Sequence, residues 1–286
     1  MISVVVPTCN RPRALARCLA ALALQRTAQA LEIVVVNDGQ EAIAAAAAVR
    51  VLRARGAGPA AARNLGARAA AGSVVCFTDD DCAPGPDWAQ RLADACAGAG
   101  AAAGTTIADP AGGAAAAAAQ LLTNTLMATS RDDASGGLAF APTCNLACDA
   151  RLLRELPFDE AFTRAAGEDR DWCSRLVAAG AGLRHVPAAV VVHRPQLGVR
   201  GLVRQQLRYG RGAVGFHAAG GSPAGAGFYG ELARGSARAG AGTAALVALA
   251  QLAVAAGAAQ QLLQQRLAGE AVTVDAADGR DGGRDV

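Results

Sequence analysis

Short apolar runs alternate with helix-like segments in the first eighty residues, and this alternation restricts the chain to few folds. The runs are rich in Val and Ile and too short for helices, so they predict buried parallel strands over residues 2–6, 32–36, 49–52 and 73–77. Segments 12–24 and 58–71 carry proline near their starts and predict helices. Repeated strand–helix units favour a doubly wound α/β sheet, mixed but mostly parallel and flanked by helices.

Polar residues follow the predicted strands at the points where the strands end. Pro7, Thr8 and Asn10 come after the first strand, Asp38 after the second, and three consecutive aspartates at 79–81 after the fourth. Doubly wound sheets bind their ligands at the carboxyl ends of the strands. We therefore expect these side chains to gather at one edge of the sheet and to form a binding site there.

The aspartate triplet, Asp79, Asp80 and Asp81, is the strongest sign of chemistry. Adjacent carboxylates at a strand end repel one another unless a cation neutralises them. Oxygen ligands favour Mg²⁺ or Mn²⁺, which commonly share their coordination with substrate phosphates. His193, at the end of a predicted strand over 188–193, would add a nitrogen ligand. A solvated acidic turn and a structural histidine stay open as alternatives.

Two further residues are candidates for nucleotide contacts. Asp38 could accept hydrogen bonds from a base or a ribose, although Asn-Asp-Gly is also an ordinary turn. Arg63, near the start of the predicted helix 58–71, could face a diphosphate together with the helix dipole. A surface arginine that points to water is the alternative for Arg63.

Glu168 and Asp169 open a predicted helix over 169–179. The N-terminus of a helix favours ionised carboxylates, which suits a general base that starts deprotonated. We expect Asp169 to take the proton of an acceptor hydroxyl, with Glu168 beside it. Helix capping explains the same pair of acids without any catalytic role.

Composition excludes some classes of protein. The chain has 286 residues and a net charge of +3 without a clustered basic face, so no nucleic-acid partner is expected. The N-terminus has no secretory signal, and the eight cysteines form neither a zinc pattern nor a dense disulfide framework. We therefore expect a cytoplasmic protein with free, mostly buried thiols.

The remaining elements divide the chain into three parts. Helices are predicted over 87–97 and 199–216, and a helix with flexible flanks within 108–137. We expect a catalytic domain over 1–220, a helical segment over 221–268 and a disordered tail over 269–286. Residues 239–265 carry no charge and are long enough to span a bilayer, but they are mostly Ala and Gln. Spanning the membrane, lying on the inner face of the cell membrane and packing on the domain all stay open.

Taken in order, these motifs resemble the family 2 glycosyltransferases of the GT-A fold, over roughly residues 1–215. The resemblance is carried by the following residues: Pro7-Thr8-x-Asn10, Val36-Asn37-Asp38-Gly39, Gly58-Pro59-x-x-x-Arg63-Asn64-x-Gly66, Phe77-Thr78-Asp79-Asp80-Asp81, Asn145-Leu146-Ala147, Phe158-Asp159-Glu160, Gly167-Glu168-Asp169-x-Asp171 and Val192-His193. Any one of these pieces is weak, whereas the ordered set is specific.

The resemblance implies a nucleotide-sugar donor, with a UDP-sugar favoured, and an inverting transfer to an acceptor hydroxyl. It assigns Asp38 and the loop from Pro7 to Asn10 to the nucleoside, and Asp80 to the ribose. Asp79 and Asp81 then form the Asp-x-Asp motif that holds the metal and the diphosphate, and Asp169 is the catalytic base.

One departure bears on how many sugars are added. The run Gln205-x-x-Arg208-Tyr209 resembles the Gln-x-x-Arg-Trp signature of processive polysaccharide synthases, with Tyr209 in place of Trp. We therefore expect a single transfer to an acceptor that the sequence does not identify. A nucleotidyltransferase and a non-catalytic nucleotide-binding scaffold on the same fold are the alternative functions.

Overall fold

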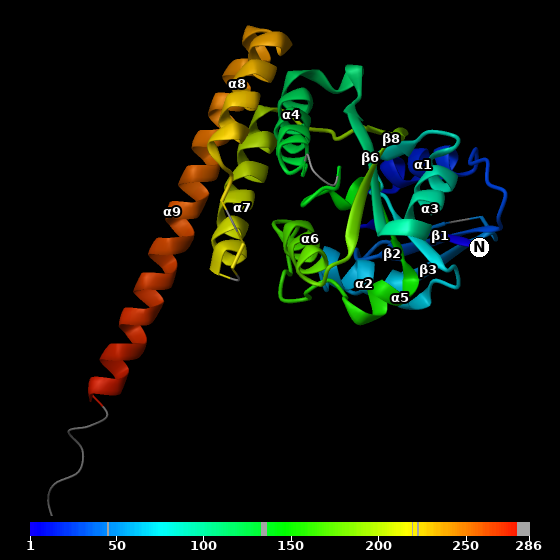
Figure 1. Cartoon of the computed structure of the whole chain (residues 1–286). Helices are drawn as coiled ribbons and strands as arrows, with labels where there is room; N and C mark the ends of the chain where they lie inside the picture. The colour runs from blue at the N-terminus through cyan, green and yellow to red at the C-terminus, as the bar shows by residue number, and fades with distance from the viewer. Residues whose placement is uncertain (45, 133–135, 219, 222, 279–286) are drawn as a thin grey trace, which may run out of the picture.

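The computed structural model describes residues 1–44, 46–132, 136–218, 220–221 and 223–278. Within them, an eight-stranded sheet in the order β3-β2-β1-β4-β7-β6-β8-β5 is flanked by helices, and a C-terminal group of helices stands beside it (Figure 1). The strands are β1 (Ile2–Thr8), β2 (Leu31–Asn37), β3 (Val49–Arg53), β4 (Val74–Phe77), β5 (Cys82–Pro84), β6 (Gly100–Ala108), β7 (Leu146–Asp149) and β8 (Gly182–His193).

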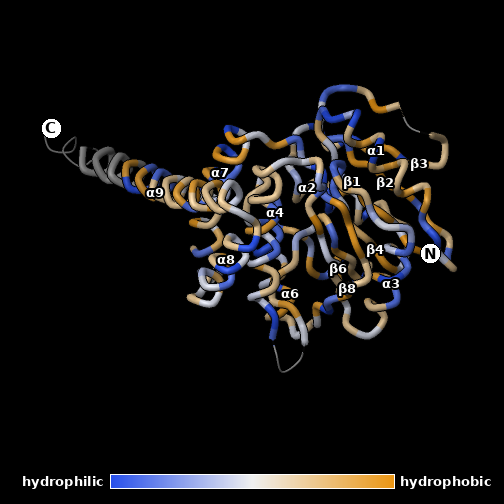
Figure 2. The backbone as a smooth tube through the Cα atoms, turned by 90° about the horizontal axis from the view of Figure 1, so that it is seen from above, coloured by the Kyte–Doolittle hydropathy of each residue, from blue (hydrophilic) through white to orange (hydrophobic). Residues whose placement is uncertain are grey.

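The parallel strands β3, β2, β1 and β4 form the half of the sheet that the sequence predicts. Val5 of β1 packs on the face that α2 (Pro59–Ala69) covers, whereas Val4 and Val6 pack on the opposite face. That face is covered by α1 (Pro12–Leu22) and α3 (Trp88–Ala99). Alternate side chains of a strand point to opposite faces, so a continuous Val run is buried on both sides. The predicted doubly wound α/β sheet is confirmed, and Figure 2 shows the hydrophobic colour along β1 and β4.

The prediction was wrong about the burial of β3. This strand is the edge of the sheet and pairs with β2 on one side. Val51 is exposed, and so are the two arginines of the strand, Arg50 and Arg53. Charged side chains on an edge strand keep it from pairing with another chain, which explains why its pattern differs from that of its neighbours.

Three strands, β5, β6 and β7, were not predicted. The run Ala101 to Ala103 in β6 is fully buried, although Ala has a low strand propensity, because β7 and β8 pair with it on either side. The register of β6 with β8 shifts after Gly104, where a Cβ atom would lie 1.9 Å from the carbonyl oxygen of Ala189. The helix predicted within 108–137 is α4 (Gly113–Thr129).

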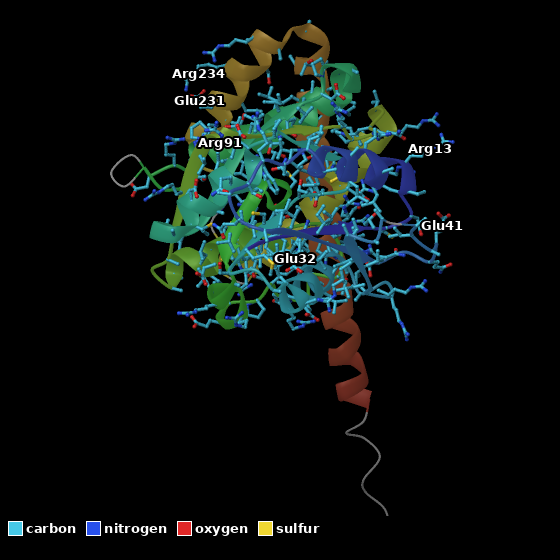
Figure 3. All side chains as sticks on the ribbon, turned by 90° about the vertical axis from the view of Figure 1, so that its right-hand side faces the viewer. Arg13, Glu32, Glu41, Arg91, Glu231 and Arg234 are labelled. Carbon is cyan, nitrogen blue, oxygen red and sulfur yellow. The ribbon has the colours of Figure 1, made fainter. Side chains whose placement is uncertain are left out.

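The pairing of β5 with β8 brings the acidic loop, residues 79–81, beside His193. Cys82 of β5 lies opposite His193 of β8 in the antiparallel register. The loop of residues 79–81 joins β4 to β5, so it runs directly past His193. Two further helices are α5 (Ala150–Glu155) and α6 (Glu168–Ala178), and α6 begins at the predicted pair of acids. Charged side chains such as Arg13, Glu41 and Arg234 project outward in Figure 3, away from this region.

Three C-terminal helices pack on α4 and on one another: α7 (Val199–Ala218), α8 (Ala226–Ala239) and α9 (Ala241–Asp278). The backbones of α7 and α9 meet at two glycines. A Cβ atom on Gly210 would lie 2.0 Å from the carbonyl oxygen of Val254, and one on Gly257 would lie 2.0 Å from that of Leu207. Close approach of two helices therefore depends on the absence of a side chain at both positions.

By length and composition, α9 has a segment that could cross a membrane, Ala241–Leu267, with a hydropathy of 1.7 and 28% of its apolar window buried. The core helix of a soluble protein meets the same criterion, so this is weak support for membrane association. The helix continues to Asp278, beyond the boundary expected at residue 268. Residues 279–286 of the predicted tail lie outside the described part of the chain.

We predict that Gly257→Ala destabilises the protein by about 1–3 kcal/mol, since the new methyl group overlaps the backbone of α7. Gly230→Ala is the matched control, because Gly230 lies in α8 with open space around it. Removing a glycine from an exposed helix interior stabilises by about 0.5–1 kcal/mol. Urea unfolding of both variants checks the two signs, and equal stabilisation by both would contradict the close contact of α7 with α9.

Candidate active site

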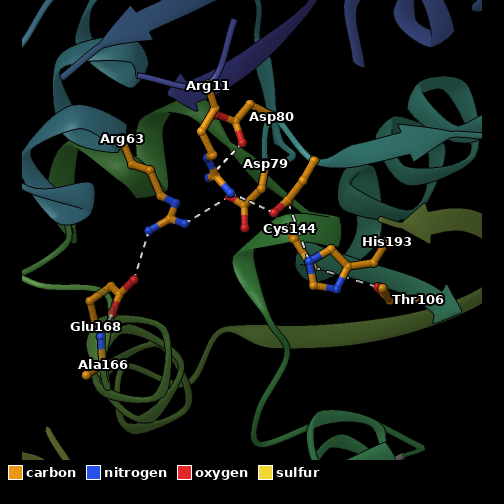
Figure 4. Close-up of polar contacts among 10 residues, drawn as sticks. Arg11, Arg63, Asp79, Asp80, Thr106, Cys144, Ala166, Glu168 and His193 are labelled. Carbon is orange, nitrogen blue, oxygen red and sulfur yellow. Dashed lines mark hydrogen bonds and ion pairs between the residues drawn. The ribbon is translucent and has the colours of Figure 1, made fainter. Parts of the chain in front are cut away.

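The predicted polar residues gather at one edge of the sheet, as Figure 4 shows for the acids, arginines and histidine. The loop after β4 supplies three aspartates, β8 supplies His193 and the start of α6 supplies Glu168. The backbone N–H of Arg194 donates to the carbonyl oxygen of Asp81 at 2.8 Å, which fixes the acidic loop against the end of β8.

Asp80 connects the acidic loop to the loop after β1. Its side chain is fully buried, accepts from the Thr8 hydroxyl at 2.5 Å and lies 2.6 Å from the Arg11 guanidinium. Burial raises the pKa of Asp80 to about 6, although Arg11 and Thr8 act in the opposite direction. The carboxylate is thus held by the protein itself, so its predicted contact with a ribose stays a prediction.

Asp81 and His193 form the pair that best fits a metal ion. The Asp81 carboxylate lies 2.7 Å from Arg11 and 3.4 Å from His193 Nε2. Although burial raises the pKa of Asp81, the hydrogen bond from His193 and the charges of His193 and Arg11 lower it overall. Burial lowers the pKa of His193, but Asp81 outweighs this effect and raises it to about 9. Without a metal, the imidazole is therefore protonated at neutral pH.

The chemistry of the donor set agrees with a divalent cation. The Gln120 carbonyl oxygen lies 2.8 Å from His193 Nδ1, so Nδ1 donates to it and the neutral ring keeps Nε2 for a metal. The Cys82 sulfur lies within 4.8 Å of the Asp81 and His193 ligand atoms. A hydrogen bond with Cys144 and burial raise the pKa of the Cys82 thiol well above its usual range, so this sulfur stays protonated. Of the predicted ligands, the structure thus brings Asp81 and His193 together. The carboxylate of Asp79 lies 3.1 Å from Arg63, and its part in metal binding stays a prediction.

Arg63 does not point freely toward solvent. It is 4% exposed, and its two terminal nitrogens lie 3.1 Å from Asp79 and 3.0 Å from Glu168. The other oxygen of Glu168 accepts from the backbone N–H of Ala166 at 2.9 Å. Both ends of the Glu168 carboxylate are therefore occupied, which suits a positioning residue better than a proton acceptor. The expected contact of Arg63 with a diphosphate stays a prediction.

Asp169 lines a cavity beside this network. One of its oxygens accepts from the backbone N–H of Arg170 at 2.8 Å. Burial and the neighbouring Glu168 raise the pKa of Asp169 to about 7, against the opposing charge of Arg63. The sequence led us to expect that the helix terminus would keep this carboxylate fully ionised, but burial and Glu168 outweigh that effect. A pKa near neutrality is well suited to a general base.

The loops after β1 and β2 are tied to each other. Asn10, in a left-handed conformation with φ of 53°, accepts from the backbone N–H of Gln40 at 3.1 Å. The Asp38 oxygens accept from the backbone N–H groups of Ala57 and Gly58 at 2.8 and 3.0 Å. Asp38 therefore fixes the loop before α2. Pro7, Thr8, Asn10 and Asp38 all lie at the expected edge of the sheet, and their contacts with a nucleotide stay predictions.

Two residues of this network were not predicted. Arg11 compensates the charge of Asp80 and Asp81, and Gln120 orients His193. Arg11 directly follows the predicted loop of Pro7 to Asn10, so its place in the sequence could have identified it as a site residue. Gln120 lies in the Ala-rich α4, far from any motif, and the sequence offers no comparable signal for it.

A cavity of about 370 Å³ joins these groups to the C-terminal helices. Asp79, His193 and Asp169 line it on the side of the sheet. Gln206 of α7, Phe228 of α8 and Val254 of α9 line it on the other side. The predicted base and two of the predicted metal ligands therefore face the same space.

Residues 3–154 match the model of the family described as Glycosyl transferase family 2. A pre-mycofactocin glycosyltransferase of Mycobacterium tuberculosis is 28% identical over 227 residues, which are 74% of this chain and 47% of that protein. Chondroitin synthase of Escherichia coli is 35% identical over 99 residues, 31% of this chain and 14% of the synthase. The chain thus spans at most about half the length of these relatives.

Solved structures agree on the fold. A mannosyltransferase from Pyrobaculum calidifontis, solved with GDP-Man and Mn²⁺, has a TM-score of 0.51 and 20% identity over 96% of this chain and 80% of its own. TarS of S. aureus has a TM-score of 0.52 and 15% identity over 73% of this chain and 39% of its own. The family match favours sugar transfer over the nucleotidyltransferase alternative. The chain therefore belongs to glycosyltransferase family 2, and its fold is the GT-A fold expected from its motifs.

Proposed function

We propose that this protein transfers one sugar from a nucleotide-sugar donor to an acceptor hydroxyl, with inversion and with the help of Mg²⁺ or Mn²⁺. The observation that carries the proposal is that Asp79, His193 and Asp169 line one cavity. A metal-binding cluster for the donor and a general base for the acceptor are then close to the same space. A UDP-sugar is the favoured donor.

Two solved neighbours support a diphosphate donor. The P. calidifontis mannosyltransferase was solved with GDP-Man and Mn²⁺, and residues 1–349 of TarS were solved with UDP, at a TM-score of 0.50 and 17% identity. These ligands belong to those proteins, and they make UDP and GDP the two nucleotides to test here. The loops that end in Asn10 and Asp38 form the expected nucleoside side of the site.

The chemistry follows from the placement of charge. A divalent cation held by Asp79, Asp81 and His193 would supply positive charge against the departing nucleoside diphosphate. Asp169 takes the proton of the acceptor hydroxyl while its oxygen attacks the anomeric carbon. The bond from that carbon to the diphosphate breaks on the opposite face, so one displacement inverts the configuration. Arg63 holds Glu168 and Asp79 in place and thereby fixes the start of α6.

We propose that the protein uses its nucleotide-sugar donor in the cytoplasm. The free thiols of the described residues agree with this reducing compartment. Attachment of α9 to the inner face of the cell membrane stays a prediction, because its apolar segment also packs against α7 and α4.

We predict that UDP or GDP binds in a metal-dependent manner and that Asp81→Asn weakens Mn²⁺-dependent binding by at least about tenfold, since it removes a ligand charge. Asp94→Asn is the matched control, because Asp94 is an exposed acid on α3 away from the cluster. Calorimetric titration of each nucleotide with and without Mn²⁺ measures the effect. If Asp81→Asn binds the nucleotide as tightly as the wild type does, or if Mn²⁺ has no effect on nucleotide binding, the metal is not part of the proposed site.

We predict that kcat/KM falls about tenfold per pH unit below pH 7 and reaches a plateau above it. The pKa of Asp169 is raised to about 7, so the carboxyl is protonated and inactive as a base at lower pH. The measurement is release of the nucleotide at saturating Mn²⁺ from a UDP-sugar or a GDP-sugar, whichever nucleotide the titration shows to bind. Asp169→Asn should lower the rate by about 10²–10⁴-fold and abolish this pH dependence. A flat profile between pH 5.5 and 8.5 in the wild type would exclude Asp169 as the base.

A further inference from the structure

Aromatic side chains are concentrated in the cavity beside Asp169. The chain has only six Phe, two Tyr and two Trp, and five of these ten residues line this one cavity. They come from different elements: Phe140 precedes β7, Tyr209 and Phe216 lie on α7, and Phe228 and Tyr229 lie on α8. In a protein whose core is built mainly from Ala, Val and Leu, such a concentration calls for a ligand that contacts these rings.

A second hollow adjoins the cavity on the side away from the acidic cluster. It has a volume of about 390 Å³, and Leu126, Phe140, Phe216 and Phe228 line both spaces. It is lined further out by Thr129 and by the exposed Val177. We call this second hollow the apolar arm, and it lies between α4, α6 and α8.

The arm offers little to the hydroxyl groups of a sugar chain. The hydroxyls of Thr129 and Ser130 already donate to the backbone carbonyls of Thr125 and Met127, each at 2.8 Å. The Arg170 guanidinium lies 4.2 Å from the centre of the Phe216 ring, in a cation–π contact. Polar groups lose free energy when they are buried without hydrogen bonds, whereas apolar groups gain it. Ser174 is the remaining hydroxyl of the lining, and apart from it the arm favours an apolar group over a glycan.

We propose that the acceptor carries an apolar group that lies in the arm, with its hydroxyl presented to Asp169. The inference rests on the proposed function, because that function supplies the role of Asp169, and it adds the chemical class of the acceptor. The apolar group is either aromatic or aliphatic like a lipid tail, and it contacts the parts of Phe140, Phe216 and Phe228 that line the arm. Recognition of the acceptor is then carried by the C-terminal helices rather than by the loops of the sheet.

Three glucosides with the same sugar and different aglycones test the class: methyl, phenyl and octyl β-glucoside, the last below its micelle concentration. Their affinities for the full chain are measured by calorimetry with Mn²⁺ and the selected nucleotide present. Since each buried methylene strengthens binding about fourfold, we expect phenyl or octyl to bind at least about tenfold more tightly than methyl. Phenyl above octyl identifies an aromatic acceptor, and octyl above phenyl an aliphatic one.

A blocking variant locates the binding. Ser174 lies exposed on α6 and lines the arm but not the cavity of Asp79 and Asp169, so Ser174→Phe fills the arm without removing a core side chain. The variant should bind phenyl or octyl β-glucoside at most about twofold more tightly than methyl β-glucoside, while its nucleotide affinity stays unchanged. Leu24→Ser, at a leucine that is 68% exposed and remote from the cavity, is the matched control and should keep the full preference.

The outcomes separate the inference from the proposed function. If nucleotides bind but the three glucosides bind equally, the apolar acceptor is wrong and the sugar transfer stands. If Ser174→Phe keeps the full preference, the apolar group binds elsewhere, such as on the exposed leucines of α9, and the inference is overturned. If no nucleotide binds to the folded wild type, the proposed function fails, and the preference for phenyl or octyl is then measured without nucleotide.

Discussion

The arrangement of the site depends on one buried guanidinium. Arg63 is 4% exposed and joins α2 to Asp79 in the loop after β4 and to Glu168 at the start of α6. Charges attract strongly where water is excluded, and removing one partner of a buried pair typically costs about 3–5 kcal/mol. Asp169 follows Glu168 directly, so the position of this proposed base relative to the acidic loop is set by the arginine. The proposed metal side and the proposed base side of the cavity are thereby fixed together.

Charge compensation in the acidic loop is more complete than the sequence alone indicates. Three adjacent aspartates suggested a cation that would neutralise them, and the protein supplies three of its own in Arg11, Arg63 and His193. A metal ion at Asp81 would compete with Arg11 and His193. The proposed metal affinity would then depend on the protonation of His193, whose other nitrogen is held by Gln120.

The sequence predicted those parts of the molecule that are encoded locally. Runs of Val and Ile identified β1, β2 and β4, because a strand buried on both faces needs an unbroken apolar sequence. The buried strand β6 was missed, since it is built from Ala and Gly and is a strand only because its neighbours pair with it. The partners of Arg63 could not be assigned either, as Glu168 is 105 residues away and no local pattern joins them. The raised pKa of Asp169 likewise depends on burial, which local rules do not give.

One wall of the cavity comes from the C-terminal helices, and this has a consequence for inheritance. Asp79 belongs to the segment of residues 3–154 that matches the family model, whereas Asp169, His193 and the helical wall of Phe216, Phe228 and Val254 lie beyond it. Under the proposed function, the acceptor is contacted by a part of the chain that can diverge separately from the acidic loop. Substitutions in the helical wall can change which molecule is glycosylated while the donor chemistry is retained, so shared ancestry in the first part of the chain says little about the acceptor.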